Sequence, residues 1–412
     1  MEAQVLATDI VKKLTIEGYT AYFAGGWVRD FLMGHPSDDI DIATNAPPEK
    51  ILDLFPRTIL VGLAFGVIVV VIKGHQFEVA TFRKDVAYVN GRTPTEIELS
   101  TPREDALRRD FTINGMFYDP LENEVHDFVE GAEDIKRKVI RTIGNAYERF
   151  FEDRLRMIRA VRFAARFGFA IDSETQEAIR ANAVTLFPAV AMERIWQEFC
   201  KMAKYPHFDE ALIDMHRLEL LPTIFPRLKS VHLHDIRHYV ASFAHYPQKV
   251  ETILYLMGLF PTITAGDAVE ICKYLKTSSV DARLAEFFVH VRIKVQEAKE
   301  SNAIDKVEWV HLYAHSDAKT CLQVVAASMG DSERVAFLEH HQKRIKMFEN
   351  HIQRVVDKMP LINASMLIEK DIERGKIMGI LLKEAERIAI LNDLNDSGEV
   401  MNRLKATSLW PK

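Results

Sequence analysis

Glycine is distributed very unevenly along this chain. Eleven of the 18 glycines lie in residues 1–150, and only seven lie in the remaining 262 residues. Glycine supplies the tight turns between strands and weakens the interiors of helices. We therefore expect strands, turns and short helices in the first part and mainly helices in the second. The distribution predicts an α/β head followed by a long all-helical arm.

Short apolar or alternating runs in the first part meet turn residues, which is the pattern of strands and hairpins. One apolar run ends at the pair Gly25-Gly26, and two others flank Lys73-Gly74-His75-Gln76, a hairpin signal. The patterns predict strands at 19–24, 39–44, 67–72, 77–82 and 125–128, and helices at 3–16, 27–33 and 47–55. They indicate an α/β domain of about 140 residues.

From about residue 145 onward, apolar residues recur at helical spacing. Short polar or proline-bearing joints separate the helical segments, and no repeat of fixed period is present. Helices are predicted at 148–167, 173–183, 192–204, 208–220, 265–275, 280–298, 331–358 and 376–392.

Composition excludes several classes of protein. The net charge of −6 rules out a surface that is positive all over, but it does not rule out a local basic region. Cys200, Cys272 and Cys321 are too far apart in the sequence for a disulfide framework or a CxxC metal site. The longest apolar run, residues 59–72, is too short to span a bilayer, and the N-terminus has no signal-peptide pattern. We expect a cytoplasmic protein with no membrane partner.

Two clusters have the chemistry of phosphate binding. In Gly25-Gly26-Trp27-Val28-Arg29-Asp30, the glycines let backbone N–H groups approach an anion, and Arg29 lies one turn into the following helix. Arg108 and Arg109 are adjacent and could hold phosphate oxygens, or they could form a solvated pair at a helix end. Taken alone, the glycine cluster is also compatible with an ordinary strand–turn–helix.

Asp39 and Asp41 lie two residues apart in a predicted strand. Alternate residues of a strand project from the same face, so both carboxylates converge there, as at sites for Mg²⁺ and nucleotide phosphates. Glu78, on the strand predicted at 77–82, could complete a three-carboxylate cluster or could be an exposed glutamate at the sheet edge.

Five motifs together resemble the class II tRNA nucleotidyltransferases, the branch of polymerase-β-like enzymes that contains CCA-adding enzymes and bacterial poly(A) polymerases. These are GGWVRD, DIDIAT, EVATFR, RRDFTIN and EDRLRMIRAVRFAARFGF, in this order over roughly residues 19–200. The resemblance implies a head with a mixed or antiparallel sheet and helices, followed by a helical neck, body and tail. On this sequence the four parts are 1–140, 141–200, 201–330 and 331–412, with the tail contacting tRNA.

The resemblance also implies roles for the matching residues. Asp39 and Asp41 would bind two Mg²⁺ ions, which activate the RNA 3′-hydroxyl and neutralise the pyrophosphate as it leaves. Gly26 and Arg29 would contact the nucleotide triphosphate, and Arg109 would assist. The implied activity is template-independent addition of CCA to the 3′ end of tRNA from CTP and ATP.

The segment 152–162 offers a means of selecting the base. If it is helical, Asp153, Arg156, Arg159 and Arg162 lie on one face; the alternative is an amphipathic helix with an exposed arginine face. Asp153 can only accept a hydrogen bond and Arg156 can only donate, which matches the amino group and ring nitrogen shared by cytosine and adenine. Uracil and guanine present the reverse pattern, so both would be rejected. The resemblance assigns this template role to the same two residues, with Arg159 and Arg162 holding the nucleotide or orienting the pair.

Four alternatives are considered within and beyond the family. Residues 60–66 lack the basic pair of the poly(A) polymerases, which favours tRNA as the substrate. Residues 83–94 resemble the flexible loop of enzymes that add the full CCA sequence. Addition of only the terminal A remains possible. A non-catalytic RNA-binding protein would be expected to have damaged carboxylates, but Asp39 and Asp41 are intact. The histidines at 232–238 could bind a metal in a phosphohydrolase or could lie on a helix surface. Oligomeric state is not indicated.

Basic side chains concentrate in one segment of this acidic chain. Residues 135–166 carry ten basic side chains and three acidic ones. The positive charge therefore lies where the head meets the helical arm, which is where the motifs place the nucleotide and the RNA 3′ end. A second basic stretch, at 331–358, could track tRNA phosphates or form a solvated helix.

Overall fold

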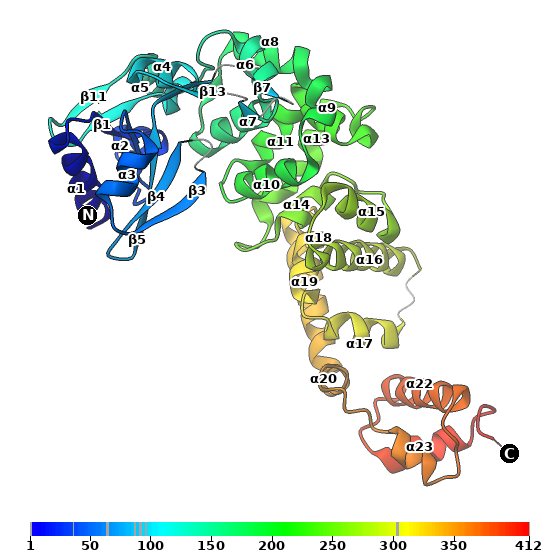
Figure 1. Ribbon diagram of the computed structural model, residues 1–412. Coiled ribbons are helices and arrows are strands. Elements are labelled where there is room, and N and C mark those ends of the chain that lie inside the picture. Colours follow the sequence, from blue (N-terminus) through cyan, green and yellow to red (C-terminus); the bar gives the residue numbers. More distant parts are fainter. Residues whose placement is uncertain are drawn as a thin grey trace. The chain divides into compact units, whose positions relative to one another are not determined.

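The computed structural model describes residues 2–35, 37–62, 66–85, 88–89, 93–94, 97–301 and 305–411. The chain forms two compact units, Met1–Arg237 and His238–Lys412. The first unit begins with a mixed sheet and continues into helices, and the described residues of the second are helical (Figure 1). The predicted α/β head and helical arm are confirmed, and the four-part division at 140, 200 and 330 stays a prediction.

The head contains a seven-stranded sheet in the order β11-β10-β1-β2-β5-β4-β3. Only the β2–β5 pair is parallel; the other pairs are antiparallel. The strands are β1 (Ala21–Ala24), β2 (Asp41–Thr44), β3 (Thr58–Gly62), β4 (Val67–Ile72), β5 (His75–Thr81), β10 (Phe117–Asp119) and β11 (Glu124–His126). The helices of the head are α1 (Glu2–Ile16), α2 (Gly26–Leu32), α3 (Pro48–Leu54), α4 (Pro102–Leu107) and α5 (Gly131–Arg137).

The predicted hairpin is present, but its turn is shorter than the sequence suggested. Ile72 pairs with His75, so only Lys73 and Gly74 form the turn, both with positive φ angles (50° and 87°). Two successive positive φ angles match the twist of an antiparallel pair, which explains why the strands extend to the two-residue turn.

Four short strands follow the main sheet. β6 (Arg83–Asp85) pairs with β9 (Ile97–Leu99), and β7 (Tyr88–Val89) pairs with β8 (Thr93–Pro94). Residues 86–87 and 90–92 of the predicted loop 83–94, and residues 63–65 of the segment 60–66, lie outside the described residues.

The sheet separates a large core from the face that carries the predicted site. Phe23, Ile42 and Val79 point to one face, where they pack with α1, α2 and α3 in the main hydrophobic core of the head. Their neighbours Ala24 and Ala43 point to the opposite face, beside Phe82 and Phe117. Because side chains alternate along a strand, Asp41 lies on this second face with Ala43.

The helical part of the first unit begins with a broken helix. The sequence predicted one helix over 148–167, but the structure has α6 (Ala146–Glu152) and α7 (Leu155–Phe167), separated by Asp153 and Arg154. Asp153 has an extended backbone, and its carboxylate accepts a hydrogen bond from the Leu155 amide, which replaces the helical bonding pattern. The helix α7 ends at Gly168, which has a positive φ of 64°.

The rest of this unit is helical apart from one short parallel pair, β12 (Val139–Ile140) with β13 (Ala170–Ile171). Its helices are α8 (Ser173–Asn182), α9 (Leu186–Ala189), α10 (Met192–Met202), α11 (Phe208–Arg217) and α12 (Leu220–Ile224), and the division between the units falls within α13 (Leu233–Ala241).

The second unit contains further helices and its own tail core. They are α14 (Thr252–Gly258), α15 (Ala265–Leu275), α16 (Ser279–Ser301), α17 (Lys306–Ala314), α18 (Ala318–Ala326), α19 (Asp331–Met347), α20 (Glu349–Asp357), α21 (Ala364–Ile368), α22 (Lys376–Leu391) and α23 (Ser397–Lys405). The helix predicted at 331–358 is therefore two helices that meet at Phe348. Leu367, Leu381 and Leu404 lie in a core formed by residues 362–404.

Two predictions from composition can be compared with these elements. The three cysteines are all free, and none forms a disulfide. Within the described ranges, no helix combines the length and apolarity needed to cross a membrane.

Candidate functional site

A cavity of about 640 Å³ opens in the first unit, between the sheet and the helices that follow it. Its walls come from the start of α2, the residues before β2, the segment 108–114, and helices α7 and α10. Ten of the eleven predicted site residues line it: Gly25, Gly26, Arg29, Asp39, Asp41, Arg109, Asp153, Arg156, Arg159 and Arg162. Glu78 does not line the cavity. The sequence motifs thus converge on one place.

Gly25 brings three of these motifs into contact. It precedes α2 with a φ of +66°, a conformation that glycine adopts readily. A Cβ atom at this position would lie 3.2 Å from Nη1 of Arg109 and 3.7 Å from Oδ2 of Asp41. The backbone at Gly25 can therefore pass close to both groups only because it has no side chain.

Asp41 stands at the acidic end of the cavity. Residues 42 and 79 are partners in the β2–β5 pair, so Asp41 and Glu78, one residue earlier on each strand, lie side by side on the same face. The pKa of Asp41 is raised to about 6, first because the surrounding protein removes solvent from its carboxylate, and then because Glu78 and Asp39 are near. Arg109 partly opposes this rise in pKa.

The environment of Asp41 fits a bound cation, because a positive charge would reduce the electrostatic repulsion between the neighbouring carboxylates. Asp39 precedes β2 instead of lying within it, so the two aspartates converge from a loop and a strand end. No three His, Cys, Asp or Glu side chains in the described part of the chain form a metal-holding group, and the three-carboxylate cluster with Glu78 stays a prediction. The histidine run at 232–238 forms no such group either.

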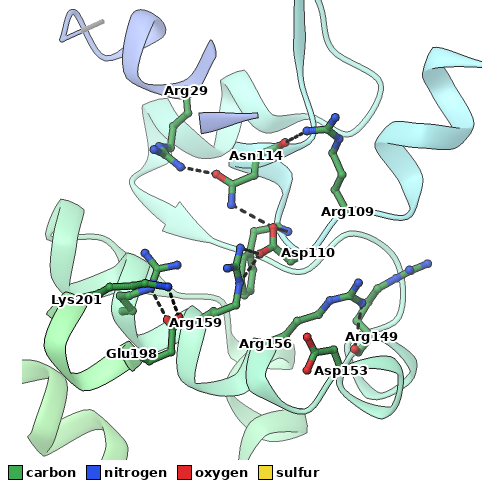
Figure 2. Close-up of polar contacts among 12 residues, drawn as sticks. Arg29, Arg109, Asp110, Asn114, Arg149, Asp153, Arg156, Arg159, Glu198 and Lys201 are labelled. Carbon is green, nitrogen blue, oxygen red and sulfur yellow. Dashed lines mark hydrogen bonds and ion pairs between the residues drawn. The ribbon is translucent and has the colours of Figure 1, made fainter. Parts of the chain in front are cut away.

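Arg109 is held against the acidic end by a buried carboxylate. Its Nη2 and Nε donate to Oδ2 of Asp105 at 2.9 and 3.2 Å. Its Nη1 donates to the carbonyl of Asn114 at 3.3 Å (Figure 2). Burial alone would raise the pKa of Asp105, but Arg109 and Arg108 outweigh burial and lower it. The guanidinium group therefore has a fixed orientation beside Gly25 and Asp41.

Arg29 is almost fully buried, with 3% of its surface exposed. Its Nε donates to Oδ1 of Asp30 at 2.8 Å, its Nη1 donates to Oδ1 of Asn114, and its guanidinium lies 4.6 Å from the centre of the Phe167 ring. Burial lowers the pKa of Arg29, and Asp30 opposes that change. Arg29 borders the cavity as a positive group tied to the head and to α7.

Asp153 and Arg156 line the same cavity but do not lie on one helical face as predicted. Asp153 precedes α7, because the helix begins only at Leu155. Oδ2 of Asp153 accepts from Nη2 of Arg194 at 3.1 Å, and Nη1 of Arg156 donates to Oε2 of Glu152 at 2.6 Å. Each member of the predicted base-reading pair is thus oriented by its own partner, and both are labelled in Figure 2.

Arg159 and Arg162 follow on α7, and each is paired with a buried acid. Arg159 donates to Oδ2 of Asp110 through Nε at 2.9 Å (Figure 2). Arg162 donates through Nε to Oε2 of Glu198. Burial would raise the pKa of Asp110, but Arg159 and a hydrogen bond from Asn114 outweigh it and lower the pKa to about 2. Asp110 therefore fixes α7 to the head as a charged group.

Comparison with known proteins agrees with this geometry. Residues 21–141 match the poly A polymerase head domain, and residues 168–231 match the "probable RNA and SrmB-binding site of polymerase A". The solved structure of the Bacillus stearothermophilus CCA-adding enzyme in complex with CTP is similar over 97% of both chains, with a TM-score of 0.77 and 28% identity. The chain is thus similar to CCA-adding enzymes and, over its first part, to the poly A polymerase head domain.

The curated relatives match about half of this chain. The CCA-adding enzyme of Streptococcus mutans is 40% identical over 207 residues, and that of Geobacillus stearothermophilus is 44% identical over 207 residues. Each match covers 50% of this chain and 51% of the relative. The chain therefore spans about half the length of the curated relatives it matches.

The sequence analysis missed the acids that hold the arginines of the cavity. Asp105, Asp110 and Glu198 received no role, although Asp110 lies within the quoted motif RRDFTIN. A signal for Glu198 exists, because it lies on the buried side of α10 with Ile195, Phe199 and Met202. An acid on an apolar helix face indicates a buried partner, and here that partner is Arg162.

Proposed function

We propose that this chain adds CCA to the 3′ end of tRNA from CTP and ATP, with Mg²⁺ as the divalent cation. The observation that supports this best is the single cavity that contains both Asp39 with Asp41 and Asp153 with Arg156. The first pair has the chemistry for metal-bound phosphates, and the second has the chemistry for reading a base edge. A nucleoside triphosphate needs both at opposite ends of one site.

At the phosphate end, Asp39 and Asp41 would hold the metal, and Arg109 beside Gly25 would contact phosphate oxygens. When bound, Mg²⁺ supplies charge neutralisation on the triphosphate and a lower pKa for the attacking 3′-hydroxyl. Bond formation between that hydroxyl and the α-phosphate releases pyrophosphate. Arg109 contributes fixed positive charge there, because Asp105 orients it before the nucleotide arrives.

At the base end, Asp153 would accept a hydrogen bond from the amino group of cytosine or adenine. Arg156 would donate a hydrogen bond to the ring nitrogen of the same base. Arg194 and Glu152 hold these side chains, so the acceptor and the donor have defined positions. A uracil would place its carbonyl against the acceptor and its N–H against the donor. Leaving such buried groups unpaired supports discrimination by orders of magnitude.

The direct test is incubation with tRNA that lacks its 3′ end, plus CTP, ATP or both, followed by sizing of the product. With both nucleotides and Mg²⁺ we expect three added nucleotides and then termination. A long A tail would instead identify a poly(A) polymerase, and a single A added only to a tRNA that already ends in CC would identify an A-adding enzyme. The absence of any incorporation by the wild-type chain would refute the proposal.

Two substitutions separate the roles of the two ends. Asp41→Ala should abolish transfer of every nucleotide, whereas Asp153→Ala should retain transfer and admit UTP and GTP. Glu148→Ala is a matched control, because this acid is exposed on α6 and does not line the cavity. Unchanged discrimination in Asp153→Ala would remove the base-reading role from this residue.

A further inference from the structure

Two aromatic side chains are exposed on helix α6, next to the base end of the cavity. Tyr147 is 44% exposed and Phe151 is 69% exposed, more than any other phenylalanine in the described residues. They are four residues apart, so they lie on the same side of the helix one turn from each other. Asp153, which lines the cavity, follows Phe151 by only two residues. An apolar ring therefore faces solvent close to the nucleotide site.

The ring of Phe151 has a positively charged group packed against it. The guanidinium of Arg154 lies 4.7 Å from the ring centre. Nη1 of Arg154 donates to the carbonyl of Phe151 at 2.6 Å, and its Nε donates to Oγ1 of Thr185 at 3.3 Å. Thr185 in turn donates to the carbonyl of Asn182, so the stack is anchored on the end of α8. The aromatic–guanidinium pair is ordered before any ligand binds.

We propose that Phe151, supported by Arg154, is a stacking platform for an unpaired base near the 3′ end of the RNA; this rests on the proposed function. Aromatic rings and guanidinium planes are the groups on which proteins stack single-stranded bases. An RNA whose 3′-hydroxyl reaches Asp41 must leave its preceding nucleotides outside the nucleotide position. The exposed ring beside Asp153 offers those bases a surface that needs no sequence match.

The size of the patch favours a base over a protein partner. A stable protein interface needs an extended, closely packed surface, whereas α6 presents two aromatic rings with the charged Glu148 between them. One flat ring with a guanidinium behind it matches the area of a single base. The positive charge of Arg154 also suits the adjacent phosphate.

The test uses the full chain and a tRNA minihelix with 2-aminopurine immediately before its 3′-terminal nucleotide; the fluorescence of 2-aminopurine falls when it stacks. Wild type should quench this fluorescence, and Phe151→Ala should lose most of the quenching and bind the RNA roughly 5- to 100-fold more weakly. Phe151→Trp should retain both properties. Phe151→Leu keeps an apolar side chain without an aromatic face, so it should behave like Phe151→Ala.

Tyr274→Ala is the matched control, because Tyr274 is 42% exposed and lies on α15 in the other unit. Its quenching and RNA affinity should equal those of wild type. The CTP affinity and the far-ultraviolet circular dichroism of Phe151→Ala should also be unchanged, which excludes misfolding as the cause of its weaker RNA binding.

Quenching and RNA affinity that survive in Phe151→Ala, or that are restored by Phe151→Leu, would overturn the platform while leaving nucleotide addition by wild type intact. A change only in self-association would assign the patch to protein contact and would also overturn it. Failure of wild type to extend any RNA would instead refute the proposed function.

Discussion

Replacing Asp110 by asparagine tests the junction between the head and helix α7. Asp110 is buried, and it receives hydrogen bonds from Arg159, from Nδ2 of Asn114 at 3.1 Å and from the Phe111 amide at 2.9 Å. Asp110→Asn keeps the size of the side chain and removes its charge. Arg159 would then keep its own charge and lose its only carboxylate partner among the described ion pairs.

The expected loss of stability follows from the pKa of Asp110. A decrease from its ordinary value of 3.8 to about 2 corresponds to about 2.5 kcal/mol of stabilisation at neutral pH, since one pKa unit is worth ~1.4 kcal/mol. Removing one partner from a fully buried ion pair costs roughly 3–5 kcal/mol. Arg159 is 32% exposed, so water partly compensates it, and we expect about 2–3 kcal/mol for Asp110→Asn.

The pH dependence has a definite sign. Because the folded-state pKa of Asp110 is lowered, its contribution is fully present above about pH 4 and is lost as the pH falls toward 2. The stability difference between wild type and Asp110→Asn should therefore be constant from pH 5 to 7. It should shrink to roughly half near pH 3.

Hydrogen exchange of peptides from α7 is the suitable assay, because the chain has two units and a single unfolding midpoint would mix them. Asp53→Asn is the matched control; its partner Lys50 is 3.7 Å away, and both side chains are largely exposed. That pair should contribute no more than about 1 kcal/mol to the free energy of unfolding.

The double variant Asp110→Asn/Arg159→Met should recover part of the lost protection, because it leaves no unpaired charge. Equal protection in Asp110→Asn and Asp53→Asn, or a difference that does not change with pH, would refute this account.

Three further outcomes follow from the same geometry. Gly25→Ala should weaken CTP binding at least tenfold in a titration, because its Cβ would press on Arg109. Gly34→Ala is the control: Gly34 also has a positive φ, but a Cβ there would meet no atom within 4 Å, so this variant should only lower the melting temperature. Mg²⁺ affinity measured by calorimetry should fall as the pH drops from 7 to 5, because Asp41 has a pKa of about 6 and its protonated form is a poor ligand. Arg194→Met should narrow the preference for CTP over UTP by about tenfold in kcat/KM, because it frees Asp153; an unchanged ratio would contradict that role.

Local sequence pattern predicted five of the seven strands of the main sheet, but it missed β3 and β10. The alternation of Asp41, Ile42 and Ala43 correctly placed the acid on the face opposite the main core. The glycine pair correctly marked the junction of β1 and α2. These features depend on neighbours in the chain, so their physical causes are visible in the sequence.

The features that could not be predicted depend on partners far away in the sequence. Arg162 and Glu198 are 36 residues apart, and Arg159 and Asp110 are 49 apart. Sequence spacing indicates that an arginine faces one side of a helix, but it does not identify the acid that approaches it from another element. The break at Asp153 was missed for a different reason, since a single side-chain hydrogen bond to the Leu155 amide overrides a strong helical pattern.

The charged side chains around the cavity are arranged largely as fixed ion pairs. Eight arginines line the cavity, and each has an ion pair with an acid. Six acids supply these pairs: Asp30, Asp105, Asp110, Glu152, Asp153 and Glu198. Glu152 also pairs with Arg149 and Glu198 also pairs with Lys201. Asp39 and Asp41 form no ion pair with the described residues. The paired arginines are preorganised, and Asp39 and Asp41 are the acids at which the divalent cation of the proposed function would add further positive charge.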